Sequence, residues 1–577
     1  MRKLSVTHAL SLFLYASTAL TAKLVDFQVA QPLTLPQTAK QCTVQILRRT
    51  FAFSYGSPEV VQYTPPTACG PVGSWAGISL NFTVTSNGTQ YDRLGIFTLD
   101  NVEIWRTSTP EPTRGDGIIW TYLKDVTRFI PLFKKPGTFV LQLDNLIQTG
   151  LDGEYATTLY ATFYASSPQH PPAAQSDLII PVTTLADNSG DVASVPPAFT
   201  LNVTLPRNLA AVYVEVIPSG NGNEEFWSMN VPNKYLDALP SETTFGYGPF
   251  REVRLSVDGQ VAGVIFPYLV IFTGGIAPTA WRPITAYAAL DLPTYFIDVS
   301  PFIPVLADGK EHAITLDVVS AESDHAINQN WYVTANLQVV LDKSSKPTTG
   351  RIVTYQVEPY ARTSTTGKVQ ANGEVDFTVT AARSVRIESD IRTGSGIDTR
   401  VIWTQSLSYS NTQTYAQNAS VQTLVQESSG AFLSTHNGAS VVSDTFAFPV
   451  NVNFTYLDST WTNWTTSIDH SFNRVSKPSP FVMGTTIQEH QVATAFFQLA
   501  SGGNFGNGTS NNQFSYTDTL GNIYRRNVGS VNSSVTYDDE GGNLASSHVP
   551  QFPHVNPAEL TFLAPRLPGR LGGGRIG

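Results

Sequence analysis

An internal repeat constrains the fold of this chain more than any other feature of its sequence. The first copy, at 124–132, reads KDVTRFIPL, and the second copy, at 297–305, reads IDVSPFIPV. Asp125 and Asp298 hold the same position in the two copies. Because a repeated residue usually serves the fold, we expect both aspartates to form turns or caps rather than to act in chemistry.

The segments around each copy also match, and they alternate between apolar and polar residues as half-buried β-strands do. A hairpin turn precedes each copy, with Asp100-Asn101 in the first half and Asp258-Gly259 in the second. These dipeptides tolerate the left-handed backbone of a tight hairpin. Two alternating segments follow each copy, at 138–144 and 159–164 in the first half and at 313–319 and 331–337 in the second. The sequence therefore predicts two related β-sandwiches.

The predicted fold class is all-β, with two tandem jelly-roll-like β-sandwich domains followed by a third β-rich region. The segment between the halves is rich in Pro, Ser and Ala, and a second break follows at Lys343–Pro347. The predicted units are a signal peptide, two sandwiches, a C-terminal β-rich domain and a disordered tail, at 1–22, 25–165, 195–342, 348–560 and 561–577 respectively.

Composition and the amino terminus indicate an exported protein. Arg2 and Lys3 precede a short apolar run and a small-residue cleavage site, as in a secretory signal peptide. No later apolar run is long enough to cross a bilayer, so we expect no membrane anchor. The net charge of −10 argues against a nucleic-acid partner, because phosphate binding needs a basic surface. The expected location is outside the cell, in the cell wall or in a vacuole.

The two cysteines and the glycosylation signals agree with export. In an oxidising compartment, Cys42 and Cys69 are expected to form one disulfide. Eight asparagines stand in Asn-x-Ser/Thr sequons and are candidate glycosylation sites: Asn81, Asn87, Asn202, Asn418, Asn453, Asn463, Asn507 and Asn532.

Catalytic motifs with strong signatures are absent from the sequence. It has no G-x-S-x-G, H-E-x-x-H, P-loop or C-x-x-C motif, and its nine histidines show no metal-ligand spacing. We therefore expect neither a metal nor a cofactor. Carboxyl groups remain as the candidate acids and bases, and a pI of about 5.4 suits carboxylate chemistry at low pH.

Two acidic clusters flanked by aromatic residues are the candidate sites. Asp92 lies between Tyr91 and Arg93 just before a predicted strand, and Glu224-Glu225 precedes Phe226-Trp227. A carboxyl group against apolar rings has a raised pKa and can remain protonated as a proton donor. From the residues alone, the alternative is a strand-end ion pair for Asp92 and a solvated turn for the two glutamates.

Five tryptophans are candidates either for stacking on sugar rings or for the sandwich cores: Trp75, Trp105, Trp120, Trp227 and Trp281.

Long segments of the chain resemble one enzyme family. They are Ala52–Gly56 with Tyr63–Pro66, Val102–Pro112, Gly248–Val253, Phe272–Ile276 with Trp281–Ile284, and Phe514–Asp518 with Asn522–Asn527. Together they resemble the peptide:N-glycanase A (glycoamidase A) family, and the likeness extends over most of residues 25–540. The family consists of acidic amidases that remove N-linked glycans from asparagine. The resemblance therefore implies hydrolysis of the glycan–asparagine amide in glycopeptides or glycoproteins.

A fainter resemblance, to bacterial peptide:N-glycanases built from two jelly rolls, suggests residue roles. Their Trp-Asp-Arg, which holds the main catalytic aspartate, is similar to Tyr91-Asp92-Arg93, and their catalytic glutamate before an aromatic is similar to Glu225-Phe226. The resemblance implies that Asp92 and Glu225 face one substrate at the interface between the two domains. Their third acid corresponds to the region of Asp144, where this chain has no glutamate.

From these resemblances and the residue chemistry, we assign Asp92 as the base that activates water and Glu225 as the group that assists the departing glycosylamine. Arg93 or Arg251 is expected to stabilise the developing oxyanion. The other expected substrate-binding residues are Glu224, Trp227 and Asp144. Two alternatives stay open: a secreted glycan-binding protein without chemistry, and a glycoside hydrolase with paired carboxylates.

Overall fold

The computed structural model describes residues 24–184, 192–500 and 504–545. Within these ranges the chain is built almost entirely from β-strands, and its three α-helices have four residues each: α1 (Ile130–Phe133), α2 (Asn233–Leu236) and α3 (Ile303–Leu306). The prediction of an all-β fold is therefore confirmed. The predicted signal peptide and tail lie outside the described residues.

The first half forms a jelly roll of two packed sheets. Its strands are β1 (Leu24–Asp26), β2 (Gln41–Phe51), β3 (Glu59–Tyr63), β4 (Gly77–Asn87), β5 (Leu94–Leu99), β6 (Val102–Ser108), β7 (Ile118–Asp125), β8 (Gly137–Leu143) and β9 (Glu154–Tyr164). One sheet has the order β1-β7-β4-β9-β2, with β1 parallel to β7, and the other has the order β3-β8-β5-β6. Stacked and edge-on contacts among Phe82, Phe97 and Trp105 fill the space between the sheets.

The second half repeats this strand order. Its strands are β10 (Leu178–Val182), β11 (Ala193–Val195), β12 (Phe199–Thr204), β13 (Leu209–Gly220), β14 (Glu252–Val257), β15 (Gln260–Ile265), β16 (Tyr295–Asp298), β17 (Glu311–Val319) and β18 (Trp331–Leu341). The order β10-β18-β13-β16 matches β2-β9-β4-β7, and β12-β17-β14-β15 matches β3-β8-β5-β6. The second pair of sheets starts at Leu178, earlier than the sequence analysis placed it, because β10 lies in the Pro-rich segment taken as a linker.

The repeated aspartates form the same turn in both halves. Asp125 Oδ1 accepts a hydrogen bond from the backbone N–H of Thr127 at 2.8 Å, and Asp298 Oδ1 accepts one from Ser300 at 2.8 Å. Each turn leads into a short 3₁₀ helix and then into α1 or α3. Both aspartates are therefore turn formers, as predicted from the repeat.

The two predicted hairpin turns are also present. Asp100 and Asn101 have φ values of 49° and 64°, and Asp258 and Gly259 have values of 48° and 78°. Positive φ at both central residues is typical of the two-residue turns that fit the twist of a hairpin. These turns join β5 to β6 and β14 to β15.

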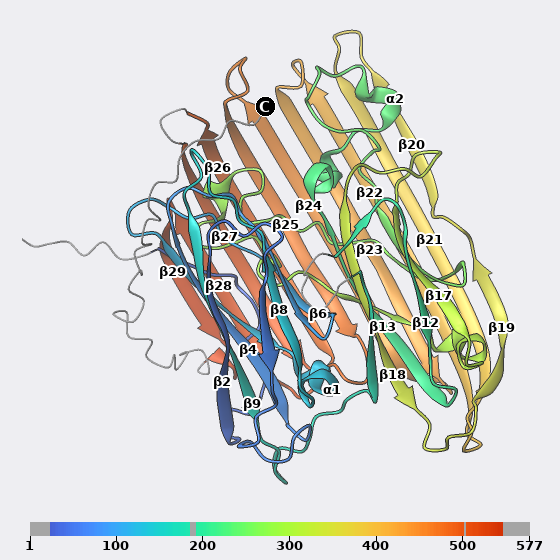
Figure 1. Ribbon diagram of the computed structural model, residues 1–577. Coiled ribbons are helices and arrows are strands. Elements are labelled where there is room, and N and C mark those ends of the chain that lie inside the picture. Colours follow the sequence, from blue (N-terminus) through green and yellow to red (C-terminus); the bar gives the residue numbers. More distant parts are fainter. Residues whose placement is uncertain (1–23, 185–191, 501–503, 546–577) are drawn as a thin grey trace, which may run out of the picture.

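The rest of the described chain forms one large antiparallel sheet, in which most strands pair in chain order. Its strands are β19 (Thr349–Val357), β20 (Arg362–Val369), β21 (Val375–Arg392), β22 (Asp398–Ala416), β23 (Val421–His436), β24 (Ala439–Tyr456), β25 (Asn463–Lys477), β26 (Thr485–Gln498), β27 (Phe505–Asp518), β28 (Ile523–Val531) and β29 (Ser534–Gly541). Figure 1 shows both jelly rolls on one face of this sheet.

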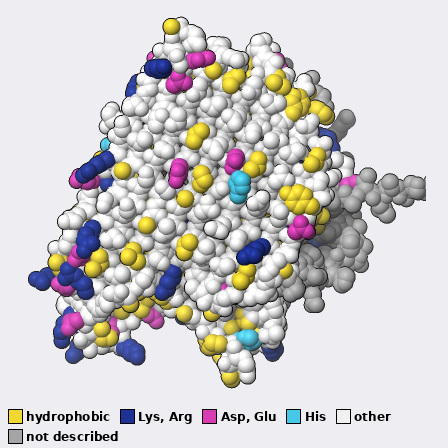
Figure 2. Space-filling view, turned by 180° about the vertical axis from the view of Figure 1, so that it is seen from behind, with side chains coloured by type: hydrophobic (Ala, Val, Ile, Leu, Met, Phe, Trp, Pro, Cys, Tyr) yellow, Lys and Arg dark blue, Asp and Glu magenta, His cyan; other side chains and the backbone are white. Residues whose placement is uncertain are grey.

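The two faces of the large sheet differ in chemistry because side chains alternate along each strand. In β22, Ser406, Ser408 and Ser410 are exposed, whereas Leu407 and Tyr409 between them are buried. Figure 2, the view from behind, shows an outer face dominated by side chains that are neither charged nor hydrophobic. A neutral polar surface of this kind keeps a wide sheet from presenting an apolar patch to solvent.

Amide side chains on the inner face attach the large sheet to the second jelly roll. Gln405 exchanges two hydrogen bonds with the backbone of Val264, at 2.8 and 2.9 Å. Gln491 accepts a hydrogen bond from the N–H of Tyr287 and donates one to the carbonyl of Thr285. A buried amide that pairs with both a donor and an acceptor leaves no polar group unsatisfied, so these contacts fix how the two parts pack.

Ion pairs join the two jelly rolls. Arg106 binds Glu103 through two hydrogen bonds of 2.7 Å and donates to Ser219 of the second jelly roll at 2.9 Å. Arg128 makes a similar two-pronged contact with Glu215, at 3.0 and 2.7 Å. The run Val102–Pro112, noted for its family resemblance, therefore contains an interface residue, Arg106, that helps to set the relative position of the halves.

The disulfide prediction is confirmed, since Cys42 and Cys69 are bonded. None of the eight sequon asparagines is buried, and Asn87, Asn202, Asn418, Asn453, Asn507 and Asn532 are exposed. Among the described residues, no helix has the length and apolar character needed to cross a membrane.

Candidate active site

One large pocket, with a volume of about 1250 Å³, is lined by all three parts of the chain. The first jelly roll contributes residues 88–93, 111–114 and 150–151. The second contributes segments within 225–245 and 274–282, and the large sheet contributes residues between 422 and 506. Such a volume is ample for a substrate larger than a single sugar. Asp92, Glu111 and Glu225 are the three carboxylic acids that line this pocket within the described ranges.

Asp92 lies just before β5 and is partly exposed to the pocket. Loss of hydration raises the pKa of its carboxyl group. A hydrogen bond from the backbone N–H of Gly274 and the positive charge of Arg93 act in the opposite direction, because both favour the ionised form. The carboxylate of Asp92 is thus held between the two jelly rolls, with one backbone donor from the second.

Glu111 follows β6 and is coupled to Asp92. Burial and the negative charge of Asp92 raise the pKa of Glu111 to about 8, while the Arg282 guanidinium and the backbone N–H of Asp92 lower it. Arg282 lies 3.7 Å from the Glu111 carboxylate and donates a hydrogen bond to its backbone carbonyl at 3.1 Å. Two adjacent carboxyl groups in a partly dehydrated site cannot both ionise easily, so one of them keeps its proton at neutral pH.

Gly274 lies against both of these carboxyl groups. A Cβ atom on Gly274 would lie 2.5 Å from Glu111 Oε1 and 2.6 Å from Asp92 Oδ1. Both oxygens therefore surround one backbone position, and only glycine leaves room for them. The closeness of the two acids depends on this residue of the second jelly roll.

Glu225 approaches from the second jelly roll. It follows the 3₁₀ turn Gly222–Glu224, which points Glu224 inward and leaves Glu225 partly exposed in the pocket. Burial and the charge of Asp92 raise the pKa of Glu225 to about 8. The structure therefore brings together Asp92 and Glu225, the two residues predicted to face one substrate.

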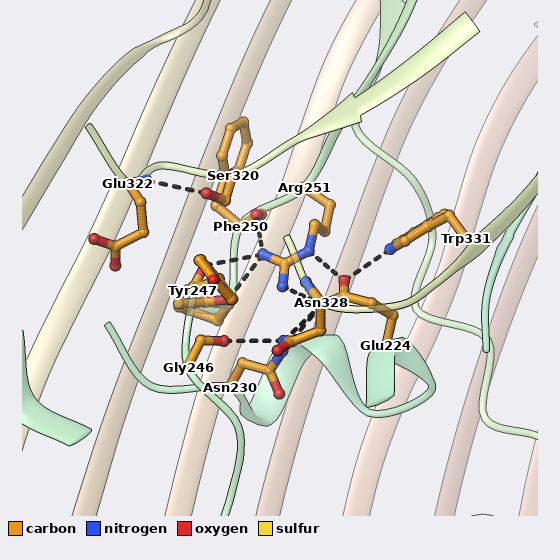
Figure 3. A network of polar contacts seen from close by, with 12 residues as sticks. Glu224, Asn230, Gly246, Tyr247, Phe250, Arg251, Ser320, Glu322, Asn328 and Trp331 are labelled. Atoms are coloured by element: carbon orange, nitrogen blue, oxygen red, sulfur yellow. Dashed lines mark hydrogen bonds and ion pairs between the residues drawn. The ribbon is translucent and has the colours of Figure 1, made fainter. Parts of the chain in front are cut away.

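Glu224 and Arg251, both predicted to bind substrate, form a fully buried ion pair and do not line the pocket. Arg251 Nε and Nη2 donate to the Glu224 carboxylate at 2.5 and 2.8 Å, and Trp331 Nε1 donates to it at 2.8 Å (Figure 3). Although burial alone raises the pKa of Glu224, Arg251 and these donors bring it below its usual value. The structure therefore places both residues outside the pocket lining, and their contacts fix the turn that carries Glu225.

Of the two substrate-binding residues predicted in the first jelly roll, Arg93 lines the pocket and Asp144 does not. Arg93 lines the pocket and donates to Gln90 at 2.6 Å and Asn145 at 3.3 Å. Asp144 lies outside the pocket lining and accepts a hydrogen bond from the N–H of Gly56 at 3.0 Å, because its side chain turns toward the 54–57 loop. The adjacent Asn145, rather than Asp144, contacts Arg93.

Trp227, which was also predicted to bind substrate, lies outside the pocket lining. It is only 3 % exposed and packs against Trp331 with ring centroids 5.9 Å apart. All five candidate tryptophans are buried in cores. The exposed aromatic residues that do line the pocket are smaller and come from loops and strand ends: Tyr91, Phe226, Phe245 and Phe505.

Sequence reasoning missed Glu111 and Arg282. Glu111 lies in the run Thr109-Pro110-Glu111-Pro112, where two prolines suggest only a rigid extended segment. Its role depends on Gly274 and Arg282, which are more than 150 residues away in the sequence. Both residues do lie in the segments that carried the family resemblance, and that resemblance was the one feature of the sequence that could have pointed to them.

These features define a class: an all-β protein of two jelly rolls with three interacting carboxyl groups in one cleft. Carboxyl groups arranged in this way can serve as the acid and the base of a hydrolysis. A model of the family described as "Peptide N-acetyl-beta-D-glucosaminyl asparaginase amidase A" matches residues 32–358, and one described as "PNGase A C-terminal domain" matches residues 376–450. The chain belongs to this amidase A family.

A relative from Prunus dulcis, named peptide-N4-(N-acetyl-beta-glucosaminyl)asparagine amidase A, is 36 % identical over 425 residues. The match covers 70 % of this chain and 72 % of the relative.

Two solved structures are more distant. PNGase F from Flavobacterium meningosepticum is 13 % identical, with a TM-score of 0.34, and the match covers 52 % of this chain and 96 % of that one. PNGF-II is 12 % identical, with a TM-score of 0.36, and the match covers 53 % of this chain and 66 % of that one. Similarity at this level carries no argument about the site.

Proposed function

We propose that this protein is an amidase that hydrolyses the bond between an N-linked glycan and the asparagine side chain of glycopeptides or glycoproteins. The products are an aspartate-containing peptide and a glycosylamine. The observation that carries the proposal is the cluster of Asp92, Glu111 and Glu225 in a pocket of a chain that belongs to the amidase A family. The activity named for the Prunus dulcis relative supports it.

In this proposal Asp92 is the general base. Of the three coupled acids, it has the most donors that favour the ionised form, namely Gly274 N–H, Ser108 and the Arg93 charge. The ionised carboxylate takes a proton from water, and the water oxygen attacks the carbon of the asparagine side-chain amide. Gly274 and Arg93 keep the Asp92 carboxylate charged and oriented while it acts.

Glu225 is the proposed proton donor. Burial and the negative charge of an ionised Asp92 raise the pKa of Glu225 to about 8, so Glu225 keeps its proton beside that charge. The C–N bond of the tetrahedral intermediate breaks as Glu225 donates a proton to the leaving nitrogen, which departs as the glycosylamine. Two carboxyl groups with separate pKa values thus supply the base and the acid of one hydrolysis.

Negative charge that develops on the amide oxygen requires a cationic or hydrogen-bonding partner. Arg282 is the proposed donor, since it lines the pocket and contacts Glu111. Arg93, the earlier candidate, stands beside Asp92 in the same pocket. Glu111, protonated at neutral pH, leaves the positive charge of Arg282 available for the oxyanion.

The decisive experiment follows one glycopeptide by mass spectrometry in heavy-oxygen water. The wild type should release a peptide that carries one labelled oxygen in the new aspartate. Asp92→Asn should lower the rate by about 10²–10⁴-fold, and Glu225→Gln should also be impaired. Glu311→Gln, which removes an exposed carboxylate outside the pocket, is the matched control and should retain the wild-type rate.

The two alternatives give different products. A glycoside hydrolase would leave one N-acetylglucosamine on an unlabelled asparagine, and a non-catalytic binding protein would leave the glycopeptide intact. Either result would reject the amidase. If Asp92→Asn and Glu225→Gln both keep the wild-type amidase rate, the activity remains but the residue assignment fails.

We also propose that the protein is exported to the cell exterior, the cell wall or a vacuole. The disulfide Cys42–Cys69 and the surface position of the sequon asparagines support this proposal. Expression in a eukaryotic secretory host should give a medium fraction whose mass exceeds that of the polypeptide. An unmodified protein confined to the cell lysate would reject it.

A further inference from the structure

The large sheet contributes a continuous aromatic surface to the active-site pocket. It consists of Phe454, Tyr456, Trp464, Phe497 and Phe505, which all line the pocket and are here called the aromatic wall. These residues lie at neighbouring ends of the paired strands β24, β25, β26 and β27. The wall therefore belongs to a part of the chain that contributes none of the three acids.

Ring contacts join four of the five residues of the wall, all except Phe505. Trp464 stacks on Phe454 with ring centroids 5.9 Å apart and contacts Phe497 at 5.2 Å. Phe454 and Tyr456 meet edge-on at 4.8 Å. Side chains that support one another in this way present fixed faces, so a ligand that stacks on them does not have to order them first.

A backbone segment of the second jelly roll connects the wall to the acids. Trp464 Nε1 donates a hydrogen bond to the carbonyl of Ile276 at 3.0 Å. Two residues earlier, Gly274 lies against the carboxyl groups of Asp92 and Glu111. Because the chain passes from the acids to the wall within three residues, a substrate held at Asp92 extends directly onto the aromatic surface.

The wall combines apolar faces with neutral polar groups. Phe505 is 61 % exposed, and the neighbouring Leu499 is 47 % exposed. Gln422 and Asn504 add amide groups to the same part of the lining. Within the described residues, the large sheet contributes no charged side chain to the pocket.

This chemistry selects the type of ligand. A sugar ring has an apolar C–H face that stacks on an aromatic ring and hydroxyl groups that bind amides. A peptide of variable sequence brings charged side chains, which this neutral surface would have to dehydrate without a partner. Arg93 and Arg114, which the first jelly roll contributes to the pocket lining, are better suited to those charges.

We infer that the aromatic wall is a binding subsite for the neutral sugars of the glycan beyond the one joined to asparagine. The inference rests on the proposed amidase function, since it places the scissile bond at Asp92 and Glu225. Phe505 supplies the most exposed stacking face of the wall, and Trp464 contacts the backbone at Ile276, two residues from Gly274. The wall makes the enzyme select substrates with a glycan core rather than a single sugar.

The first test measures binding without hydrolysis. The probe is a free oligosaccharide of two N-acetylglucosamines and three mannoses, titrated into the protein by calorimetry. Phe505→Ala should raise the dissociation constant by about five- to fifteen-fold, because it removes one stacking face. Phe505→Tyr should restore binding to within about twofold, since the ring is retained. Phe53→Ala is the matched control, because Phe53 is 68 % exposed and lies outside the pocket.

The second test compares kcat/KM for two glycopeptides with the same peptide, one with this five-sugar core and one with a single N-acetylglucosamine. The ratio of the two values should exceed one in the wild type and fall toward one in Phe505→Ala.

Several outcomes would overturn the inference: no binding of the oligosaccharide to the wild type, equal binding by wild type and Phe505→Ala, or a Phe505→Ala loss of kcat/KM that is equal for the two glycopeptides. The last result would assign the wall to the part that the two glycopeptides share. Failure to hydrolyse either glycopeptide would reject the amidase proposal, and the calorimetric result would still decide whether the wall binds sugar.

Discussion

Replacing Gly274 with alanine should abolish most of the activity while leaving the fold intact. The φ angle of Gly274 lies outside the left-handed region, so alanine meets no backbone strain there. The added Cβ would lie 2.5 Å from Glu111 Oε1 and 2.6 Å from Asp92 Oδ1. Contacts of this kind need about 3.5 Å, so both carboxyl groups must move by roughly 0.5–1 Å.

The expected losses of stability and of rate depend on which atoms the added Cβ displaces. The crowded atoms are the ends of two side chains that face an open pocket, so the free energy of unfolding should fall by less than about 2 kcal/mol. A displacement of about 1 Å in a group that must contact water and substrate costs on the order of 10²-fold in rate. We therefore expect Gly274→Ala to lower kcat/KM by about 100-fold with a nearly unchanged urea denaturation curve.

The assay is the same heavy-oxygen mass spectrometry, run beside urea denaturation. Gly541→Ala is the control, because a Cβ at Gly541 meets no atom within 4 Å. That variant should match the wild type in both measurements. A folded Gly274→Ala enzyme whose kcat/KM stays within threefold of the wild type would refute the idea that the close approach of Asp92 and Glu111 to this backbone is needed for activity.

Three further predictions concern pH and stability. Burial and the Asp92 charge raise the pKa of Glu225 to about 8, so the folded protein keeps a proton that the unfolded chain loses above its ordinary pKa of 4.5. The free energy of unfolding, measured by urea denaturation, should therefore fall as the pH rises from about 5 to 8. Glu225→Gln should make this fall smaller. An unchanged dependence on pH in that variant would contradict the raised pKa of Glu225. Arg251→Met leaves the Glu224 charge buried without its main partner and should cost about 3–5 kcal/mol in the same experiment, whereas a loss below 1 kcal/mol would argue against the buried pair. Replacing Cys42 and Cys69 by serine opens a loop with a sequence separation of 27 residues and should cost about 3–4 kcal/mol, and two free thiols in the unreduced, denatured wild type would show that the bond does not form.

The fold was predictable from sequence because its signals are local. Asp125 and Asp298 each bind a backbone N–H two residues ahead, so the same short motif gives the same turn in both halves. The Asp100-Asn101 turn needs positive φ at both residues, and Asp and Asn are residue types that tolerate this conformation. Strand order followed from the repeat, since equal runs of strands close into equal sandwiches.

The site was only partly predictable because burial decides the role of each charged residue. Glu224 and Glu225 are adjacent and chemically alike, yet one points into the core toward Arg251 and the other into the pocket. Nothing in the local sequence distinguishes them, since the 3₁₀ turn that separates them depends on Arg251 and Trp331. Glu111 likewise gains its raised pKa from burial and from the charge of Asp92, which lies on another segment of the chain.

The pocket is assembled in an order that protein synthesis imposes. The ribosome completes Asp92, Glu111, Glu225 and Arg282 within the first half of the chain, but the aromatic wall at 454–506 emerges only near the end. The nascent jelly rolls therefore carry the acids on a surface that still lacks one side of its pocket. If the wall selects the glycan, a partly synthesised chain can have reactive carboxyl groups but no selectivity. Glycoproteins in the same compartment meet the complete selective site only after β27 has paired with β26.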